Sequence, residues 1–248
     1  MVTLKTSKEL AKMRTAGAIT AQALQAGGAA VRPGITTGEI DRIIKEFIIS
    51  KGAKPSFLGY GGFPGSACIS VNDEVIHGIP GKRVIKEGDI VSIDVGAIYD
   101  GYQGDSAATF AAGAVSAEAQ GLMDATQESL LAAIAVMRVG ARLGDIGHAV
   151  QSYVEARGYG VVREYVGHGI GREMHEEPEV PNYGHPGHGM RLVAGMVLAV
   201  EPMITQFSPA VRVLGDDWTV VTKDHGLAAH FEHTIAVTEK GPVILTLP

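Results

Sequence analysis

The feature that most constrains the fold is a repeat that relates the first half of the chain to the second. Two helix-like segments align at one offset, and the matching positions are Arg32 with Arg138, Gly34 with Gly140, Gly38 with Gly144, Glu39 with Asp145, Ile40 with Ile146, Phe47 with Tyr153, Ile48 with Val154 and Gly52 with Gly158. Shifted by one more residue, the apolar run that ends at Asp94 aligns with the run that ends at Glu201, so an acid matches an acid. The simplest physical account is two pseudo-equivalent α+β halves, which would bring these two acids to equivalent positions about a common axis.

The composition is that of a globular protein with enough apolar residues for a full core. The chain has 248 residues, of which 46% are hydrophobic, so it can fold as one large domain. We predict a single domain over residues 1–248, with repeat halves at about 1–110 and 111–248. The net charge is −6 and the basic residues do not cluster, which argues against a nucleic-acid surface.

Nothing in the chain predicts export or membrane insertion. The apolar runs fall well short of the roughly 20 residues that a membrane-spanning helix needs. Lys5, Lys8, Glu9 and Lys12 are spread through a helical pattern, whereas a signal peptide places its charges before an apolar block. Cys68 is the only cysteine, which excludes an internal disulfide and fits a reducing compartment. We therefore expect a soluble protein of the cytoplasm.

Four helices are expected from capping signals and apolar periodicity. Residues 6–9 and 36–39 each match the S/T-x-x-E capping box, which marks a helix start. Two further helices are predicted over about residues 116–139 and 145–156, the last ended by Gly158. Between the second and third helices, and after the fourth, the chain consists of short β-rich runs interrupted by glycine and proline.

An Asp-Gly pair at residues 100–101 predicts a β-hairpin. This dipeptide suits a two-residue type I′ turn, which needs positive φ at both central positions. With that turn, Asp94 faces Ala107 and Asp105 faces Gly96, and both acids point to the same face of the sheet. Their backbones are then diagonal neighbours about 7 Å apart. Two such acids would repel one another, so they are either solvated beside the turn or share a cation.

Three more residues extend this pair of acids into a candidate metal site. Glu232 projects from the strand-like run HFEHTIAV, and His168 lies in a glycine-rich run where a ligand can approach closely. Together with Asp94, Asp105 and Glu201 they form a mostly hard-oxygen set suited to Mn, Fe, Co or Zn, and carboxylates can bridge two such ions about 3.5–4 Å apart. Each residue taken singly fits a surface charge or a core histidine as well. The set of five is what indicates a metal centre.

Five separated runs of the chain carry a family resemblance, and they cover residues 70–80, 92–105, 167–178, 200–203 and 232–234. In this order and at these spacings they resemble the type I methionine aminopeptidases, and the resemblance extends over essentially the whole chain. That family has the α+β pita-bread fold, in which two related halves surround a dinuclear metal centre. The resemblance implies that the single domain is catalytic and that two divalent ions per chain are held by Asp94, Asp105, His168, Glu201 and Glu232.

The resemblance also implies catalytic roles. A water that bridges two divalent ions loses its proton near neutral pH and becomes the nucleophile, while a metal polarises the scissile carbonyl. Glu201 is expected to accept the proton. His77 and His175 are expected beside the substrate, where an imidazole can hydrogen-bond the peptide and stabilise the tetrahedral intermediate. Without the resemblance, His77 before Gly-Ile-Pro reads equally well as a histidine in a turn.

The pocket for the methionine side chain is expected to be apolar. Aromatic rings and a thiol can enclose a thioether, and the resembling positions are Tyr60, Phe63, Cys68 and Trp218, with Phe57 and Met174 at the edge. Gly61 stands where some family members carry histidine, and Met174 stands where phenylalanine is frequent. These two departures leave the second-residue preference less defined than the reaction type.

Alternatives within and outside this enzyme class remain open from the sequence. Xaa-Pro aminopeptidases and prolidases share the fold, although they usually carry an added N-terminal domain. Type II methionine aminopeptidases carry an insert between the last two ligands, whereas Glu201 and Glu232 are only 31 residues apart here. A third alternative is a non-catalytic pita-bread protein that binds partners. The presence of all five ligand positions and both histidines argues against it.

The sequence thus predicts a metal-dependent aminopeptidase that removes the initiator methionine from nascent chains and peptides whose second residue is small. Its expected partners are nascent polypeptide N-termini, with at most a transient contact to the ribosome. We expect no stable nucleic-acid binding and no membrane association. No long heptad seam is present, so a monomer is predicted.

Overall fold

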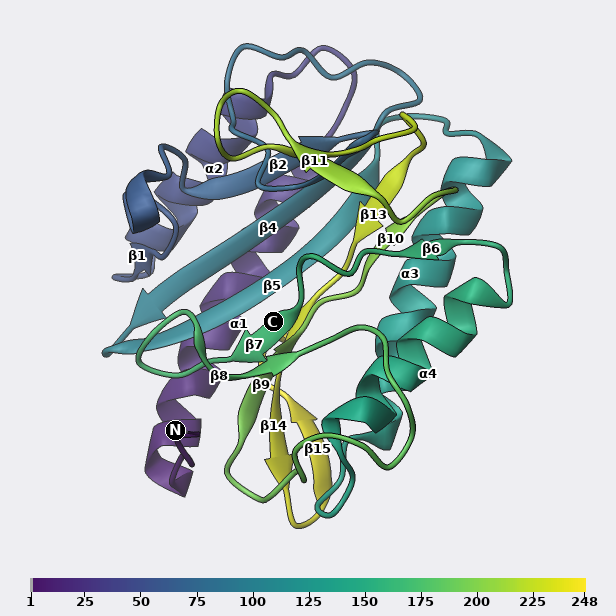
Figure 1. The fold of residues 1–248 in the computed structure, drawn as a ribbon. Helices are drawn as coiled ribbons and strands as arrows, with labels where there is room; N and C mark the ends of the chain where they lie inside the picture. The colour runs from purple at the N-terminus through teal and green to yellow at the C-terminus, as the bar shows by residue number, and fades with distance from the viewer. Residues whose placement is uncertain (1) are drawn as a thin grey trace.

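The computed structural model describes residues 2–248, and four α-helices flank a set of antiparallel sheets (Figure 1). The helices are α1 (Ser7–Ala30), α2 (Thr37–Ser50), α3 (Ala117–Val136) and α4 (Leu143–Glu155), with a short 3₁₀ turn η1 (Tyr60–Gly62). The strands are β1 (Lys54–Pro55), β2 (Ala67–Val71), β3 (Glu74–Ile76), β4 (Ile90–Tyr99), β5 (Tyr102–Ala111), β6 (Gly160–Val161), β7 (Gly167–Gly169), β8 (Glu176–Val180), β9 (Val197–Val200), β10 (Met203–Thr205), β11 (Val211–Val213), β12 (Val220–Thr222), β13 (Ala228–His230), β14 (His233–Thr238) and β15 (Gly241–Ile244). None of the helices in the described part of the chain is long and apolar enough to cross a bilayer.

The four predicted helices are confirmed, with small shifts at their ends. Both predicted capping boxes form, because Thr6 and Thr36 each cap the backbone N–H of the glutamate three residues on. The fourth helix begins at Leu143 rather than at Asp145. The reason is that the carboxylate of Asp145 accepts a 2.7 Å hydrogen bond from the backbone N–H of Arg142, so this aspartate closes the first turn instead of starting it.

The two larger sheets have four and five strands, and two three-stranded sheets of order β13-β10-β6 and β11-β12-β3 accompany them. The first sheet pairs β1, β4 and β2, with β5 on β4, and the second has the order β15-β14-β9-β7-β8. Figure 1 shows α1 and α2 behind the long β4–β5 hairpin, while α3 and α4 lie beside β13, β10 and β6. Each helix pair buries its apolar side chains in a cluster of its own, one with β2 and β4 and the other with β9 and β14. A helix pair on a sheet therefore occurs twice, as the repeat predicts.

The register predicted for the hairpin is confirmed. Asp94 pairs with Ala107 and Gly96 pairs with Asp105 along the β4–β5 ladder. The turn residues Asp100 and Gly101 have φ of 49° and 76°, which is the left-handed geometry that a type I′ turn requires.

The two glutamates of the candidate site lie just outside strands, and the prediction that Glu232 projects from a strand is wrong in this detail. Glu201 follows β9 directly and is succeeded by Pro202, which has no N–H to extend the ladder. Glu232 lies between β13 and β14. Its backbone N–H donates to the carbonyl of Ala107 in β5 at 2.9 Å rather than to a partner in the β9–β14 ladder.

Candidate active site

One cavity, which encloses about 140 Å³, receives every predicted functional side chain except that of Met174. Its lining residues are Phe57, Tyr60, Phe63, Cys68, His77, Asp94, Asp105, His168, His175, Glu201, Trp218 and Glu232. Met174 is the exception among the named positions, since it is buried in an apolar cluster with Phe57 and Cys68 and does not line the cavity. Residues from most of the length of the chain thus meet at one place.

Hydrogen bonds between β5 and the start of β14 bring Asp105 next to Glu232. The hydroxyl of Thr234 accepts a 3.0 Å hydrogen bond from the backbone N–H of Asp105 and donates to its carbonyl at 2.8 Å. One residue on, the hydroxyl of Ser106 donates to the carbonyl of Glu232 at 2.8 Å. Because these contacts fix the backbone on both sides, the two carboxylates face the cavity from neighbouring segments of the chain.

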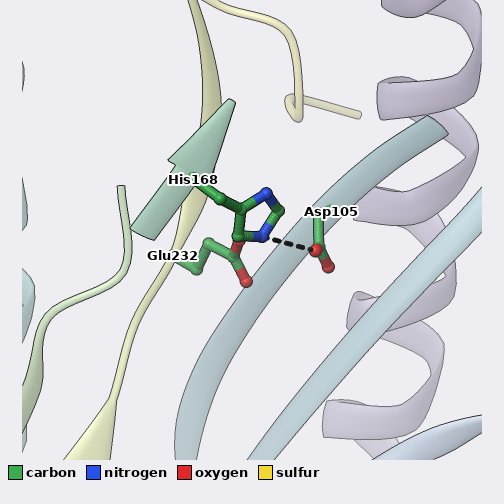
Figure 2. A group of neighbouring side chains, drawn as sticks. All are labelled: Asp105, His168 and Glu232. Carbon is green, nitrogen blue, oxygen red and sulfur yellow. Dashed lines mark ion pairs between the residues drawn. The ribbon is translucent and has the colours of Figure 1, made fainter. Parts of the chain in front are cut away.

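His168 presents one free nitrogen to these acids. Its Nδ1 lies 2.9 Å from the carbonyl of Gly169, and because a carbonyl can only accept, Nδ1 carries the proton and Nε2 keeps its lone pair. Nε2 lies 3.7 Å from Oδ2 of Asp105 and 3.6 Å from Oε1 of Glu201. Asp105, His168 and Glu232 each offer one ligand atom, and these three atoms lie within 4.8 Å of one another (Figure 2). Such a nitrogen beside carboxylates is a suitable metal ligand.

Three carboxylate oxygens at this place have no hydrogen-bond partner among the described residues. They are Oδ1 of Asp94, Oδ1 of Asp105 and Oε1 of Glu232, and each is buried. A buried carboxylate oxygen without a partner carries a large desolvation cost. Carboxylate oxygens of this kind suit a hard divalent cation, and the group whose ligand atoms lie within 4.8 Å of one another comprises Asp105, His168 and Glu232 but not Asp94.

In the protein without metal, burial is the main cause of the raised pKa values of these acids, and repulsion between them adds to it at Asp105, Glu201 and Glu232. Burial raises the pKa of Asp94 from 3.8 to about 7. Burial, together with repulsion from neighbouring acids, also raises the pKa values of Asp105 and Glu232, and the pKa of Glu201 is raised by burial and by Asp94. Burial lowers the pKa of His168 to about 4. The uncharged imidazole is the form that can bind a metal, whereas the acids must lose their protons to do so.

His175 and His77 lie at the edge of the acid cluster. Nδ1 of His175 shares a 2.7 Å hydrogen bond with the hydroxyl of Tyr60, and its ring centroid is 4.3 Å from that of His168. His77 has a φ of 58° and faces Trp218 edge-on at 6.3 Å between centroids. His77 follows β3 directly, in a segment without regular secondary structure, and its side chain lines the cavity. Burial lowers the pKa of His77 to about 4 and also lowers the pKa of His175.

An apolar wall closes the other side of the cavity. Phe63 and Trp218 meet edge to face with centroids 5.1 Å apart, and Cys68 lies opposite Asp94 in the β2–β4 ladder. Burial and the nearby acids raise the pKa of the Cys68 thiol well above its usual value, so it stays an uncharged, polarisable wall atom. At Gly61 a Cβ would lie 3.3 Å from the Trp218 ring, so a larger residue there would press on this wall.

His230 is a residue of the site that the sequence reasoning missed. Its side chain is buried, and Nε2 has no hydrogen-bond partner and lies 3.7 Å from Oε2 of Glu201. Burial, with a smaller effect of His77, lowers its pKa to about 3. A signal was present in the sequence, because in HFEHT a histidine two residues before Glu232 points to the same face of an extended segment.

Comparison with known proteins agrees with this geometry. Metallopeptidase family M24 matches residues 11–239. The methionine aminopeptidase of Clostridium acetobutylicum is 55% identical over 248 residues, which cover 100% of this chain and 99% of that protein. The chain belongs to the methionine aminopeptidases of family M24.

Solved structures of this family confirm the expected α+β pita-bread fold. The crystal structure of the methionine aminopeptidase from Thermotoga maritima superimposes with a TM-score of 0.99 at 46% identity and covers 100% of both chains. The prolidase from Pyrococcus furiosus matches with a TM-score of 0.78 at 25% identity, and the match covers 99% of this chain and 65% of that one. As a member of family M24 with a buried Asp, His and Glu group, the chain is a divalent-metal peptidase.

Proposed function

We propose that this protein removes the N-terminal methionine from peptides and nascent chains whose second residue is small. The observation that carries this proposal is that one cavity combines a cluster of unpaired carboxylates with a wall of aromatic rings and a thiol. The first can hold a catalytic metal and the second can enclose a thioether. A Met N-terminus is the substrate that needs both.

The proposed ligands are Asp94, Asp105, His168, Glu201 and Glu232, holding two ions drawn from Co, Mn, Fe or Zn. The unpartnered oxygens of three of these acids and the free Nε2 of His168 support this assignment. Bound divalent ions would supply an activated water and polarise the scissile carbonyl.

Residues of the chain would then orient the peptide and move the proton. Glu201 is the proposed proton acceptor, since its two oxygens face His168 and His230 rather than backbone donors. In the tautomer in which Nδ1 accepts from the Tyr60 hydroxyl, His175 carries its proton on Nε2 and can donate to the peptide oxygen on which negative charge develops. His77, which is uncharged at neutral pH because of its burial, is proposed to hydrogen-bond the peptide from the other side.

Nascent polypeptide N-termini are the proposed natural substrates. The cytoplasm, a monomeric state and a transient ribosome contact remain predictions, as do the halves at about 1–110 and 111–248.

An Xaa-Pro peptidase is disfavoured because the prolidase-like chains are matched over only about two thirds of their length. The reading as a non-catalytic binding protein has no support in the site, because every candidate ligand is present and faces the cavity.

The test is peptide cleavage by metal-depleted protein to which Co²⁺, Mn²⁺, Fe²⁺ or Zn²⁺ is restored singly. Met-Ala-Ser is the expected substrate, Met-Leu-Ser is the matched control for the second residue, and Ala-Pro-Ser reports the Xaa-Pro activity. Methionine release from Met-Ala-Ser alone supports the proposal and ranks the metals. Cleavage of Ala-Pro-Ser, or no cleavage with any metal, overturns it.

A further inference from the structure

A buried ion pair lies outside the cavity, between the N-terminal segment and the first residue of β8. Nζ of Lys5 is 2.5 Å from Oε2 of Glu176, and the two side chains are only 4% and 13% exposed. The pair between Lys12 and Asp100 is 46% and 57% exposed by comparison. Burying an ammonium group is costly even when it is paired, so a buried pair is a weak source of stability and calls for another explanation.

The pair connects the body of the protein to the loop between β7 and β8. Oε1 of Glu176 accepts hydrogen bonds from the backbone N–H groups of Arg172 at 2.9 Å and Glu173 at 3.4 Å. The backbone N–H of Lys5 donates to the carbonyl of Gly195 at 2.7 Å, just before β9. Lys5 is therefore anchored by its own backbone and holds the carboxylate that closes the loop.

The Lys5 and Glu176 side chains are tightly packed against the neighbouring backbone. A Cβ at Gly171 would collide with both Cε of Lys5 and Oε1 of Glu176, so the loop reaches the pair only because residue 171 is glycine. Nζ of Lys5 also donates to the carbonyl of Thr3 at 3.1 Å, which leaves the ammonium little freedom to move. Such a tightly packed arrangement transmits a change at Lys5 to the loop backbone.

His175 lies in the loop that this pair closes. It directly precedes Glu176, and the loop is bonded to the Glu176 carboxylate at residues 172 and 173. We propose that the Lys5–Glu176 ion pair positions His175, by keeping its imidazole beside His168 and within reach of Tyr60. This inference rests on the proposed role of His175 in binding the substrate. Lys5 is a positioning residue, since it does not line the cavity.

The variant Lys5→Met tests this role, because methionine keeps an unbranched apolar stem and removes the charge. Amide exchange at Arg172 and Glu173 is expected to rise, and kcat for Met-Ala-Ser is expected to fall by about 10-fold, since misplacing a reacting group by about 1 Å can cost up to about 100-fold. Bound metal is expected to be unchanged. Lys12→Met, which removes the exposed pair, is the matched control and should leave both readouts unaltered.

A double-mutant cycle separates positioning from general destabilisation. If Lys5 acts through His175, Lys5→Met should cause no further loss of kcat in a His175→Ala background. An equal fold-loss in both backgrounds, or unchanged exchange at residues 172 and 173, overturns the inference. Should Lys5→Met fail to fold, Glu176→Gln keeps one oxygen that can accept from both amides, removes the charge and is read in the same way. Amide exchange does not depend on turnover, so a wild-type protein that releases no methionine refutes the proposed function without affecting this test.

Discussion

Thr234 offers the sharpest test of how the tertiary structure builds the site. It is fully buried, and its hydroxyl satisfies both the N–H and the carbonyl of Asp105. Thr234→Val keeps the shape of the side chain and leaves these two buried groups without partners. At about 1–3 kcal/mol for each unsatisfied group, the free energy of unfolding should fall by about 2–6 kcal/mol. For a chain of this size that loss lowers Tm by roughly 5–15 °C.

The assay is urea or thermal unfolding of the metal-free protein, followed by titration with Mn²⁺. Metal affinity should also weaken, because the backbone that aims the Asp105 carboxylate is no longer fixed. Thr15→Val is the control, since Thr15 is exposed on α1 and its hydroxyl bonds only the carbonyl of Ala11, and surface changes of this kind cost less than about 0.5 kcal/mol. A Thr234→Val protein as stable as the control variant, with unaltered metal affinity, would refute the reasoning.

Further predictions concern the ligands, the histidine and the pH dependence. Asp105→Ala and Glu232→Ala should each abolish turnover and lower bound metal measured by elemental analysis; activity like that of the wild type in either variant would contradict the ligand assignment. His175→Ala should cut turnover by about 100-fold, within the range for loss of a general acid or base, and leave metal bound, whereas loss of metal would make this histidine structural or ligating. In the metal-free protein, Asp94 has a pKa raised from 3.8 to about 7. The folded state then holds a proton that the unfolded chain has released, so the free energy of unfolding should fall as pH rises from about 4 to about 7. Asp94→Asn should lack this part of the slope in thermal unfolding, and identical slopes would show that Asp94 is not the titrating group.

Local sequence signals were enough for the presence of the four helices, for the β4–β5 hairpin and for one half of the site. The two capping boxes and the Asp-Gly turn specify their structures through contacts between residues a few positions apart, so helix starts and the pairing of Asp94 with Ala107 could be read directly. The repeat predicted a helix pair on a sheet occurring twice. In the second half, the repeat, strand alternation and a glycine-rich run marked Glu201, Glu232 and His168 as candidates, and the family resemblance added His175 and Trp218.

The sequence by itself determined the helices, the hairpin register and which acids were candidates, because each depends on local backbone preferences and side-chain alternation. Only the tertiary structure decided that Glu232 would lie beside Asp105, since this needs the hydrogen bonds of Thr234 and Ser106 across more than a hundred residues of chain. It also decided the burial of His230 and the pairing of Lys5 with Glu176. Long-range contacts of this kind depend on how whole sheets pack, and burial then sets the charge state and reach of each group, which no local pattern encodes.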